Sequence, residues 1–412
     1  MSIMIDEILK ARPFIPRQVY TERIKPFIDK EIIKVISGQR RVGKSYILIQ
    51  LIAEIRQTNP SANIIYINKE LKPHEHISDA DNLYSYVKMN LIANAKNYLF
   101  IDEIQEIKYF EKALRSLLFE NCCDIFCSGS NANMLSGELA TFLAGRYIEF
   151  TVHSLGYDEF LNFFQLQNTT ENLNKYLTVG GMPYMKVIGL DEFSVFEYLR
   201  NVYSTILLKD VVAREGIRNI QFLENLIEYL ADNVGNLFSA SNIAKYLKSQ
   251  RTTITTQAVL NYLKPLSSAF FIYKVPRYDI SGLKIFEVGE KYYFEDIGLR
   301  NCICGFDQRK DINKVMENAV YLHLLRSGYK VFVGQLGTSE IDFIAEKNGI
   351  TIYVQVAFML IDENTEKREF GNLLKIADNY RKYVVTMDEY NAGSNYQGIE
   401  QVHLKDFLLN DL

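Results

Sequence analysis

Residues 38–45 have the types and the spacing of a phosphate-binding loop. They read Gly-Gln-Arg-Arg-Val-Gly-Lys-Ser, which matches the pattern G-x-x-x-x-G-K-[ST], and they lie between an apolar run and a helix-like run. Glycine lets the backbone curl so that its N–H groups point at phosphate oxygens, and the following helix adds the positive end of its dipole. We expect Lys44 to reach the β- and γ-phosphates of ATP and Ser45 to hold Mg²⁺. The residues predicted to contact the nucleotide are Gly38, Gln39, Arg40, Arg41, Val42, Gly43, Lys44, Ser45 and Tyr46.

Two acidic residues follow a second apolar run. Residues 98–101 are Tyr-Leu-Phe-Ile, which is typical of a buried strand, and Asp102 and Glu103 come directly after them. Carboxylates at the end of a core strand are costly unless a cation or a water network uses them. We therefore expect Asp102 to bind Mg²⁺ through water and Glu103 to polarise the attacking water. An exposed pair of acids at a strand end is the alternative.

Two further residues are candidates for the reaction itself. The apolar run at 125–127 ends in small polar residues, so Ser130 or Asn131 could lie beside the γ-phosphate, unless this is a plain exit from a strand. Arg146 follows Gly145, and an arginine that stabilises transition-state charge is a common requirement of nucleotide hydrolysis. A surface or structural arginine is the alternative for Arg146. The predicted catalytic residues are Lys44, Glu103, Asn131 and Arg146.

Alternating strands and helices must position these residues. Short apolar runs at 32–36, 63–67, 98–101 and 124–127 are separated by helix-like segments. This pattern predicts an α/β core with a parallel sheet that is covered on both faces. After about residue 155 the apolar residues recur at helical spacing instead, so we expect a mainly helical region there.

Length and composition limit the other possibilities. A chain of 412 residues is too long for one hydrophobic core, and its 48% hydrophobic content suits two to four domains. No run of about 18 apolar residues exists, so we expect no membrane span. Residues 1–16 lack the apolar block of a signal peptide, and five cysteines are an odd number for a disulfide framework. We expect a cytoplasmic protein with buried thiols.

Several motifs together resemble those of one family. They are residues 37–45, 99–105, 128–131, 145–146, 180–183 and 340–343. The chain resembles prokaryotic AAA+-type ATP-binding proteins that carry a C-terminal domain of unknown function 4143, and the resemblance spans nearly the whole chain. It implies an AAA+ core, a winged-helix-like segment and a restriction-nuclease-like C-terminal fold. It also implies that Arg146 belongs to the family's Gly-Arg motif, either as a sensor or as an arginine finger.

Pattern and resemblance together divide the chain into four parts. We expect an AAA+ P-loop core with a helical lead-in at 1–155, a helical lid-like region at 156–235, a winged-helix-like segment at 236–305 and a nuclease-like domain at 306–412. The predicted function is hydrolysis of ATP to ADP and phosphate, coupled to binding of a macromolecule, with DNA as the first candidate. The alternative is a slow ATP-dependent switch that controls a protein–protein contact. A homo-oligomer is compatible with both.

Residues 240–285 carry the charge of a DNA-binding surface. The whole chain has a net charge of −4, but this segment holds seven Lys or Arg residues and one Asp. A helix ending at Lys248, a second at 255–263 and strands at 271–273 and 284–288 would form a helix-turn-helix with a wing. Packing or protein contact is the alternative use of this segment. The candidate DNA-binding residues are Lys245, Lys248, Arg251 and Lys264.

The last part of the chain has an incomplete set of residues for cutting DNA. A restriction-type nuclease requires an Asp followed by an acid-x-Lys pair to hold Mg²⁺ and activate water. Asp342 is followed 13 residues later by Gln355-Val-Ala357, so an amide replaces one acid and an alanine replaces the lysine. Glu317 and Glu340 would compensate only in part. We therefore expect a nuclease-like fold that does not cut DNA.

Overall fold

A computed structural model of the chain describes residues 15–132, 143, 145–214, 216–249, 255–282, 284–285, 289–360 and 363–410. The chain forms two compact units, Met1–His153 with Ser268–Phe270 and Ser154–Ser267 with Phe271–Leu412. One expected domain boundary, at residue 155, lies close to this division. The expected boundaries at 235 and 305 stay predictions.

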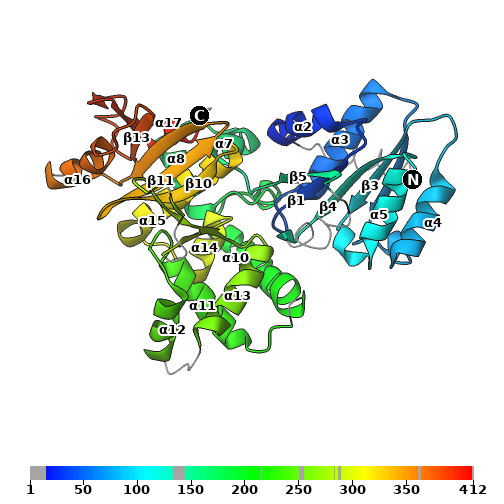
Figure 1. Ribbon diagram of the computed structural model, residues 1–412, viewed down its shortest axis with the longest axis horizontal. Coiled ribbons are helices and arrows are strands. Elements are labelled where there is room, and N and C mark those ends of the chain that lie inside the picture. The colour runs from blue at the N-terminus through cyan, green and yellow to red at the C-terminus, as the bar shows by residue number, and fades with distance from the viewer. Residues whose placement is uncertain are drawn as a thin grey trace. The chain divides into compact units, whose positions relative to one another are not determined.

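The first unit contains a five-stranded sheet in which all neighbouring strands are parallel (Figure 1). In spatial order the strands are β2 (Asn63–Asn68), β3 (Asn97–Asp102), β4 (Asp124–Gly129), β1 (Ile33–Ser37) and β5 (Tyr147–Thr151). The first four are almost continuously buried, as expected for strands that are covered on both faces. The predicted parallel α/β core is confirmed.

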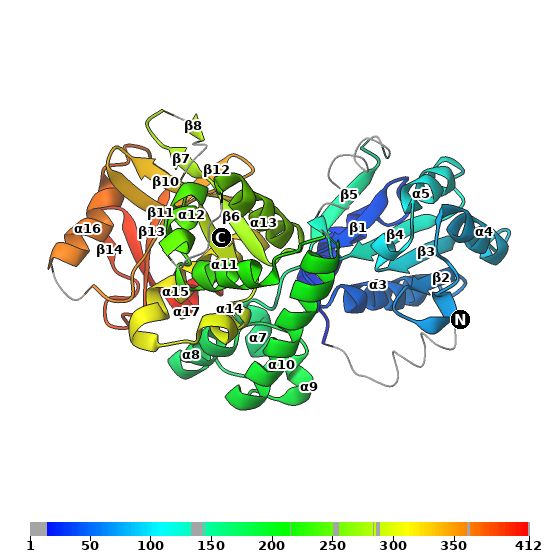
Figure 2. The same ribbon diagram turned by 90° about the horizontal axis from the view of Figure 1, so that it is seen from below.

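Helices cover both faces of this sheet and fill two separate hydrophobic cores (Figure 2). Alternate strand residues point to opposite faces, so Phe100 enters the core beneath α3 while its neighbour Leu99 enters the core beneath α5. The helices on the first face are α2 (Gln18–Ile24) and α3 (Lys44–Thr58), and those on the second are α4 (Ala80–Asn90) and α5 (Phe110–Phe119).

The second unit begins with helices, as the apolar spacing after residue 155 predicts. They are α7 (Tyr157–Phe164), α8 (Thr170–Val179), α9 (Met185–Ile188), α10 (Glu192–Thr205), a π-helix (Ile206–Ala213) and α11 (Ile220–Asp232). The Gly-Gly-Met-Pro motif follows α8 and lies against α14 (Ile297–Cys304). Gly181 N donates to Asp296 at 2.8 Å, and a Cβ at Gly180 would lie 2.4 Å from Gly298 N. These glycines are therefore needed for close backbone packing.

The basic segment contains the two expected helices, α12 (Ala240–Ser249) and α13 (Thr256–Ser268). Ser239 Oγ accepts a hydrogen bond from Asn242 N at 3.2 Å, which caps the start of α12. The predicted wing pairing is wrong, however. β6 (Ile272–Val275) pairs with β9 (Lys291–Phe294), which is buried at all four positions, and not with the strand expected at 284–288. The described part of that expected strand is β8 (Lys284–Ile285), which pairs with β7 (Arg277–Asp279), and residues 286–288 lie outside the described residues.

A mixed eight-stranded sheet forms the C-terminal part of the second unit. Its strand order is β14-β15-β13-β12-β11-β10-β7-β8. The strands from β10 onward are β10 (Lys330–Leu336), β11 (Ser339–Lys347), β12 (Ile350–Val356), β13 (Arg381–Thr386), β14 (Asn395–Tyr396) and β15 (Ile399–His403). The helices of this part are α15 (Gln308–Arg326), α16 (Glu363–Leu374) and α17 (Leu404–Phe407).

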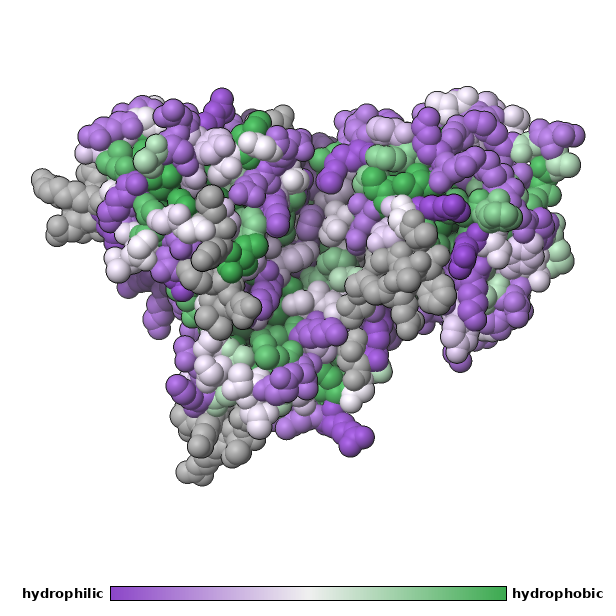
Figure 3. Space-filling model, in the orientation of Figure 1, coloured by the Kyte–Doolittle hydropathy of each residue, from purple (hydrophilic) through white to green (hydrophobic). Residues whose placement is uncertain are grey.

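Hydrophilic residues cover most of the visible face of each unit, with smaller hydrophobic patches between them (Figure 3). Among the residues that the structure describes, no helix combines the length and the apolar character needed to cross a membrane.

Candidate functional site

The loop between β1 and α3 has a backbone that only particular residues can adopt. Gly38 has a φ of 143°, and a Cβ at this position would lie 2.2 Å from the Val152 carbonyl oxygen. Gly43 has a φ of 98° and forms the N-cap of α3, so the first helical residue is Lys44. The predicted strand, glycine loop and helix are therefore present, with the loop at the carboxyl edge of the parallel sheet.

Lys44 is buried inside this loop. Its Nζ donates to the carbonyl oxygens of Gly38 at 3.0 Å and Gln39 at 2.9 Å. A lysine held by two neutral carbonyls can exchange them for phosphate oxygens, which attract the ammonium more strongly because they are charged. The loop thus holds the ammonium where a bound phosphate would meet it.

Gln39 supplies an observation that tests the fit of a nucleotide. Its side chain is completely buried, yet neither Oε1 nor Nε2 has a hydrogen-bond partner among the described residues. An unpaired buried amide is costly, whereas a phosphate oxygen would accept a hydrogen bond from Nε2. The residues present therefore fit a phosphate-bearing ligand.

Asp102 ends β3 and lies at the same edge of the sheet. It accepts hydrogen bonds from Ser128 Oγ, from the Ser45 side chain and, at 3.2 Å, from Asn68 Nδ2. Burial raises the pKa of Asp102, and the hydrogen bonds from Ser128 and Ser45 oppose that shift. The two residues predicted to bind Mg²⁺, Ser45 and Asp102, are thus brought together.

Glu103 follows in a left-handed conformation with a φ of 56°. Its Oε1 lies 4.0 Å from Lys44 Nζ, and its Oε2 accepts hydrogen bonds from Gln105 Nε2 and, at 3.2 Å, from Ser130 Oγ. Burial acts to raise the pKa of Glu103, but the positive charges of Lys44 and Arg40 outweigh burial and hold it below the ordinary value. The carboxylate is therefore ionised at neutral pH and can accept a proton from water.

The other predicted nucleotide contacts occupy the outside of the loop or support it. Arg40 pairs with Glu70 at 2.9 Å, and Arg41 and Tyr46 are exposed. Val42 is buried, and its carbonyl oxygen accepts a hydrogen bond from Arg17 Nη1 at 2.7 Å.

Sequence reasoning missed Arg17, Ser128 and Gln105. Arg17 is buried and anchors the loop from 25 residues away, so no local pattern marks it. The sequence does mark Ser128 as a candidate, because it is the first polar residue at the end of an apolar strand. Its contact with Asp102, however, depends on β4 lying next to β3, which the local sequence does not show.

The structure does not bring all four predicted catalytic residues together. Asn131 lies just after β4, at the edge of the sheet that carries Asp102. Arg146, in contrast, precedes β5, and its carbonyl oxygen accepts a hydrogen bond from Ile33 N at the start of β1. The length of β1 separates Arg146 from the loop by about 13 Å along the strand, at roughly 3.3 Å per residue. Arg146 therefore lies at the opposite edge of its own sheet from Lys44 and Glu103.

Comparison with family models agrees with this geometry in the first unit. Residues 30–161 match the model of an AAA domain, and residues 170–310 match a domain of unknown function, DUF8612. The second match replaces the expected domain of unknown function 4143, which is not confirmed.

Similar chains occur in a bacterium and in an archaeon. An "Uncharacterized protein" of Haemophilus influenzae is 38% identical over 97% of this chain and 100% of its own length. "Uncharacterized protein MJ1544" of Methanocaldococcus jannaschii is 30% identical over 97% of this chain and 89% of its own.

Among solved structures, Cdc6p from Pyrobaculum aerophilum aligns with a TM-score of 0.31 and 10% identity over 65% of this chain and 91% of its own. AMPPCP-bound DnaA from Aquifex aeolicus aligns with a TM-score of 0.29 and 16% identity over 62% of this chain and 89% of its own. Residues 30–161 form an AAA domain with a P-loop, as the family model indicates. Because the two relatives from H. influenzae and M. jannaschii match nearly the whole chain, this chain belongs to the same family as they do.

Proposed function

We propose that this protein binds ATP with Mg²⁺ and hydrolyses it to ADP and phosphate. One observation carries the proposal: Lys44, Ser45, Asp102 and Glu103 meet at one edge of the parallel sheet, although they come from two separate segments of the chain. Each has the chemistry that phosphoryl transfer requires, which is positioning and charge stabilisation more than covalent catalysis.

In this proposal Lys44 moves from the loop carbonyls to the β- and γ-phosphates. Ser45 and Asp102 hold Mg²⁺, which when bound would neutralise charge on the phosphate oxygens. Glu103 orients the attacking water and accepts its proton. Ser130 and Gln105 donate to Glu103 Oε2, and this leaves Oε1 as the oxygen that faces Lys44 and the phosphates.

Replacement of Glu103 by glutamine tests the proposal most directly. Glu103→Gln keeps the size of the side chain but removes its capacity to accept a proton, so we expect ATP binding to be retained and turnover to fall by about 10²-fold or more. Glu106→Gln is the matched control, since it makes the same change at an exposed residue three positions away. Turnover that is unaffected by Glu103→Gln would show that another residue positions the water.

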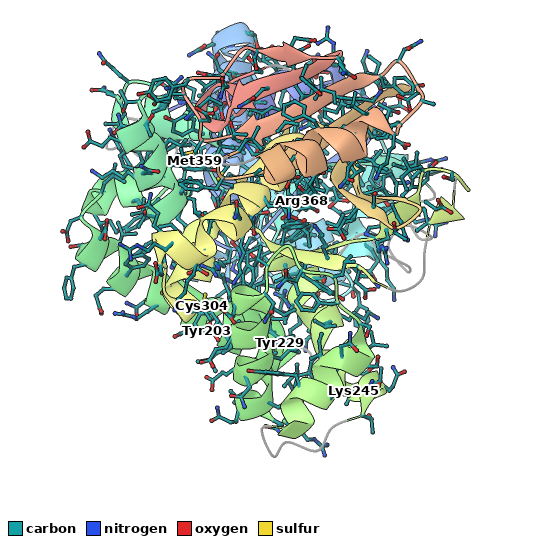
Figure 4. All side chains as sticks on the ribbon, turned by 90° about the vertical axis from the view of Figure 1, so that its left-hand side faces the viewer. Tyr203, Tyr229, Lys245, Cys304, Met359 and Arg368 are labelled. Atoms are coloured by element: carbon teal, nitrogen blue, oxygen red, sulfur yellow. The ribbon has the colours of Figure 1, made fainter. Side chains whose placement is uncertain are left out.

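The second part of the proposal is that hydrolysis is coupled to binding of a macromolecule, with DNA as the candidate. Residues 236–305 supply two consecutive capped helices followed by an antiparallel strand pair, which supports a winged-helix-like segment. Lys245 on α12 is exposed (Figure 4). Lys264 on α13 is exposed as well. Lys248 lies on α12, but its side chain and Arg251 lie outside the described residues. We further propose that 156–235 is a lid-like region and 306–412 a nuclease-like domain.

Charge reversal tests the DNA part. The double variant Lys245→Glu, Lys264→Glu should weaken DNA binding and reduce the salt slope of log K by about 0.9 for each phosphate that the protein no longer neutralises. Lys310→Glu, on α15 outside the basic segment, is the matched control. DNA affinity and DNA-stimulated ATP turnover are the measurements. If both are the same in the double variant and the control, the segment serves a protein contact and the slow-switch alternative is favoured.

A further inference from the structure

Three carboxylates converge on one buried ammonium in the second unit. Lys291 Nζ lies 2.8 Å from Glu317 Oε1, 2.9 Å from Glu340 Oε1 and 3.4 Å from Asp342 Oδ1. The Lys291 side chain is 2% exposed. We call these four residues the carboxylate–lysine cluster. They come from three elements, with Lys291 on β9, Glu317 on α15, and Glu340 and Asp342 on β11.

The cluster contains the groups that the sequence pattern predicts to be missing. Gln355 and Ala357 do stand where an acid and a lysine would follow Asp342 along the chain. Folding, however, brings a lysine to Asp342 from 51 residues earlier and an acid from α15. A lysine and a second acid therefore do lie beside Asp342 in three dimensions, and the expectation that this region does not cut DNA stays a prediction that experiment must decide.

The cluster contains more carboxyl groups than one ammonium can balance. If all three were ionised, they would leave two negative charges in a largely buried place, and burial together with their mutual repulsion raises the pKa of Glu317 to about 7 and the pKa of Asp342 above its ordinary value. Buried charges that lack a partner cost several kcal/mol. Asp342 is fixed despite this cost, because Val356 N donates to its Oδ2 at 2.9 Å and its own N–H donates to Gln355 Oε1.

A fourth acid gives an independent indication of a cationic ligand. Glu369 lies on α16 directly after Arg368, which Figure 4 labels, and Glu369 is 3% exposed. Its Oε1 accepts hydrogen bonds from Arg368, while its buried Oε2 makes no hydrogen bond of good geometry among the described residues, although the Gln355 side chain is close enough to lower the pKa of Glu369. Asp342 is close enough that its charge adds to the effect of burial in raising the pKa of Glu369, against the opposing effect of Arg368. An unpaired carboxylate oxygen beside an excess of negative charge fits a cation.

We infer that the carboxylate–lysine cluster is a divalent-cation site, for Mg²⁺ or Mn²⁺, that hydrolyses phosphodiester bonds of nucleic acid. This site is separate from the proposed ATP site, because all of its residues belong to the second unit. In the part of the chain that the structure describes, no three acidic, histidine or cysteine side chains lie where they could hold a metal ion together. The Lys291 ammonium lies between the carboxylates, so this lysine must move aside and the carboxylates must close around the cation as it enters.

The groups account for a complete hydrolytic step. The cation would be held by Asp342 and Glu317 and would polarise a phosphoryl oxygen. A water oxygen forms a bond to phosphorus while the bond from phosphorus to a sugar oxygen breaks. Glu340 accepts the proton of the water, and the leaving oxygen takes a proton from solvent. The displaced Lys291 ammonium stabilises the negative charge that develops on the phosphoryl group.

The position of Lys291 also indicates the substrate. Its strand, β9, pairs with β6, which belongs to the segment with seven basic residues and one acid. A polyanion that contacts this segment would reach the same structural element that carries Lys291. Nucleic acid is the polyanion whose backbone consists of phosphodiesters, and phosphate contacts dominate its affinity for basic surfaces.

Metal binding is the first test. Mn²⁺ binding is measured by electron paramagnetic resonance on nucleotide-free protein that carries Asp102→Asn, which removes the other candidate metal carboxylate. We expect one Mn²⁺ per chain, at least tenfold weaker affinity in Asp342→Asn, and tighter binding in Lys291→Met, since a competing positive charge is removed. Glu159→Gln is the matched control, because Glu159 pairs with Arg326 at 2.8 Å in the same unit. Binding that is absent, or equal in the parent, Asp342→Asn and Lys291→Met proteins, would overturn the inference.

Cleavage is the second test. The Asp102→Asn protein is incubated with saturating Mn²⁺ and single-stranded, duplex and branched DNA and RNA. We expect cleavage that falls at least 100-fold in both Asp342→Asn and Lys291→Met, although Lys291→Met still binds Mn²⁺. Glu340→Gln, at the most exposed carboxylate of the cluster, serves as the second variant if the others unfold, and should also reduce cleavage. No cleavage of any substrate, or cleavage that these variants leave unchanged, would overturn the hydrolytic role and leave a structural ion cluster.

Discussion

Replacement of Gly38 by alanine should disrupt the phosphate-binding loop. The atoms around Gly38 allow the size of this effect to be predicted. A Cβ there would lie 2.2 Å from the Val152 carbonyl oxygen, well inside van der Waals contact. Val152 cannot easily give way, because it is fully buried and its N–H donates to Ser37 O at 2.8 Å. Either the loop or the start of the segment after β5 must therefore shift.

Two costs combine in Gly38→Ala. A φ of 143° is a region that side-chain-bearing residues rarely adopt, which costs about 1–3 kcal/mol. The overpacking against Val152 adds about 1–3 kcal/mol. We expect a local loss of about 2–6 kcal/mol from these two sources together. Gly145→Ala is the matched control, since Gly145 has a φ of 75° but no heavy atom within 4 Å of the built Cβ, so that about 1–2 kcal/mol of strain remains.

Hydrogen–deuterium exchange of the β1 and α3 amides and titration with a fluorescent ATP analogue are the assays. In Gly38→Ala the amides should exchange faster and nucleotide binding should weaken by more than tenfold, while both should stay near the wild-type values in Gly145→Ala. Equal effects of the two substitutions would refute the argument that contact with Val152 makes Gly38 necessary.

Two other predictions concern residues of the first unit. Because the pKa of Glu103 is held below the ordinary glutamate value of about 4.3, its carboxylate protonates only below that pH, and catalysis that depends on it is lost only there. A single-turnover rate that does not change from about pH 8 to pH 5 is expected, and an acidic inflection in this range that disappears in Glu103→Gln would contradict it. Arg146 lies at the far edge of its own sheet, so a catalytic role requires another copy of the chain. Addition of Arg146→Ala chains to wild-type protein should then lower turnover more than dilution does, and a strictly proportional response would exclude that role.

The central residues of the candidate ATP site could be predicted from local sequence patterns alone. The glycine loop, Lys44 and the Asp102–Glu103 pair each follow an apolar run of strand length, and parallel strands place such ends at one edge. Contacts between distant segments were not predictable in this way. Ser128 meets Asp102 because β4 lies between β1 and β3, and strand order depends on crossovers that no short motif encodes.

The second unit shows the same limit. Lys291 reads as an isolated lysine before an aromatic run, and only the pairing of β9 with β6 and the packing of α15 bring it to Asp342. The wing pairing was wrong for a related reason. A short run after a Ser-Gly turn favours a hairpin with its nearest neighbour, and that hairpin does form as β7–β8, but the burial of β9 decides which strand pairs with β6.

The Ser128 hydroxyl gives the site a fixed hydrogen-bond direction. A hydroxyl has one hydrogen, and here its oxygen already accepts from Glu103 N at 3.2 Å, so the hydrogen points to Asp102 Oδ1. Asn68 Nδ2 donates to the other oxygen. Asp102 is therefore kept as an acceptor on both sides, which favours the ionised form even though burial disfavours it. The Ser45 side chain and the Tyr66 hydroxyl hydrogen-bond to Asp102 as well, so its roughly four acceptor positions are all in use, and a cation or its water shell must displace one of these donors.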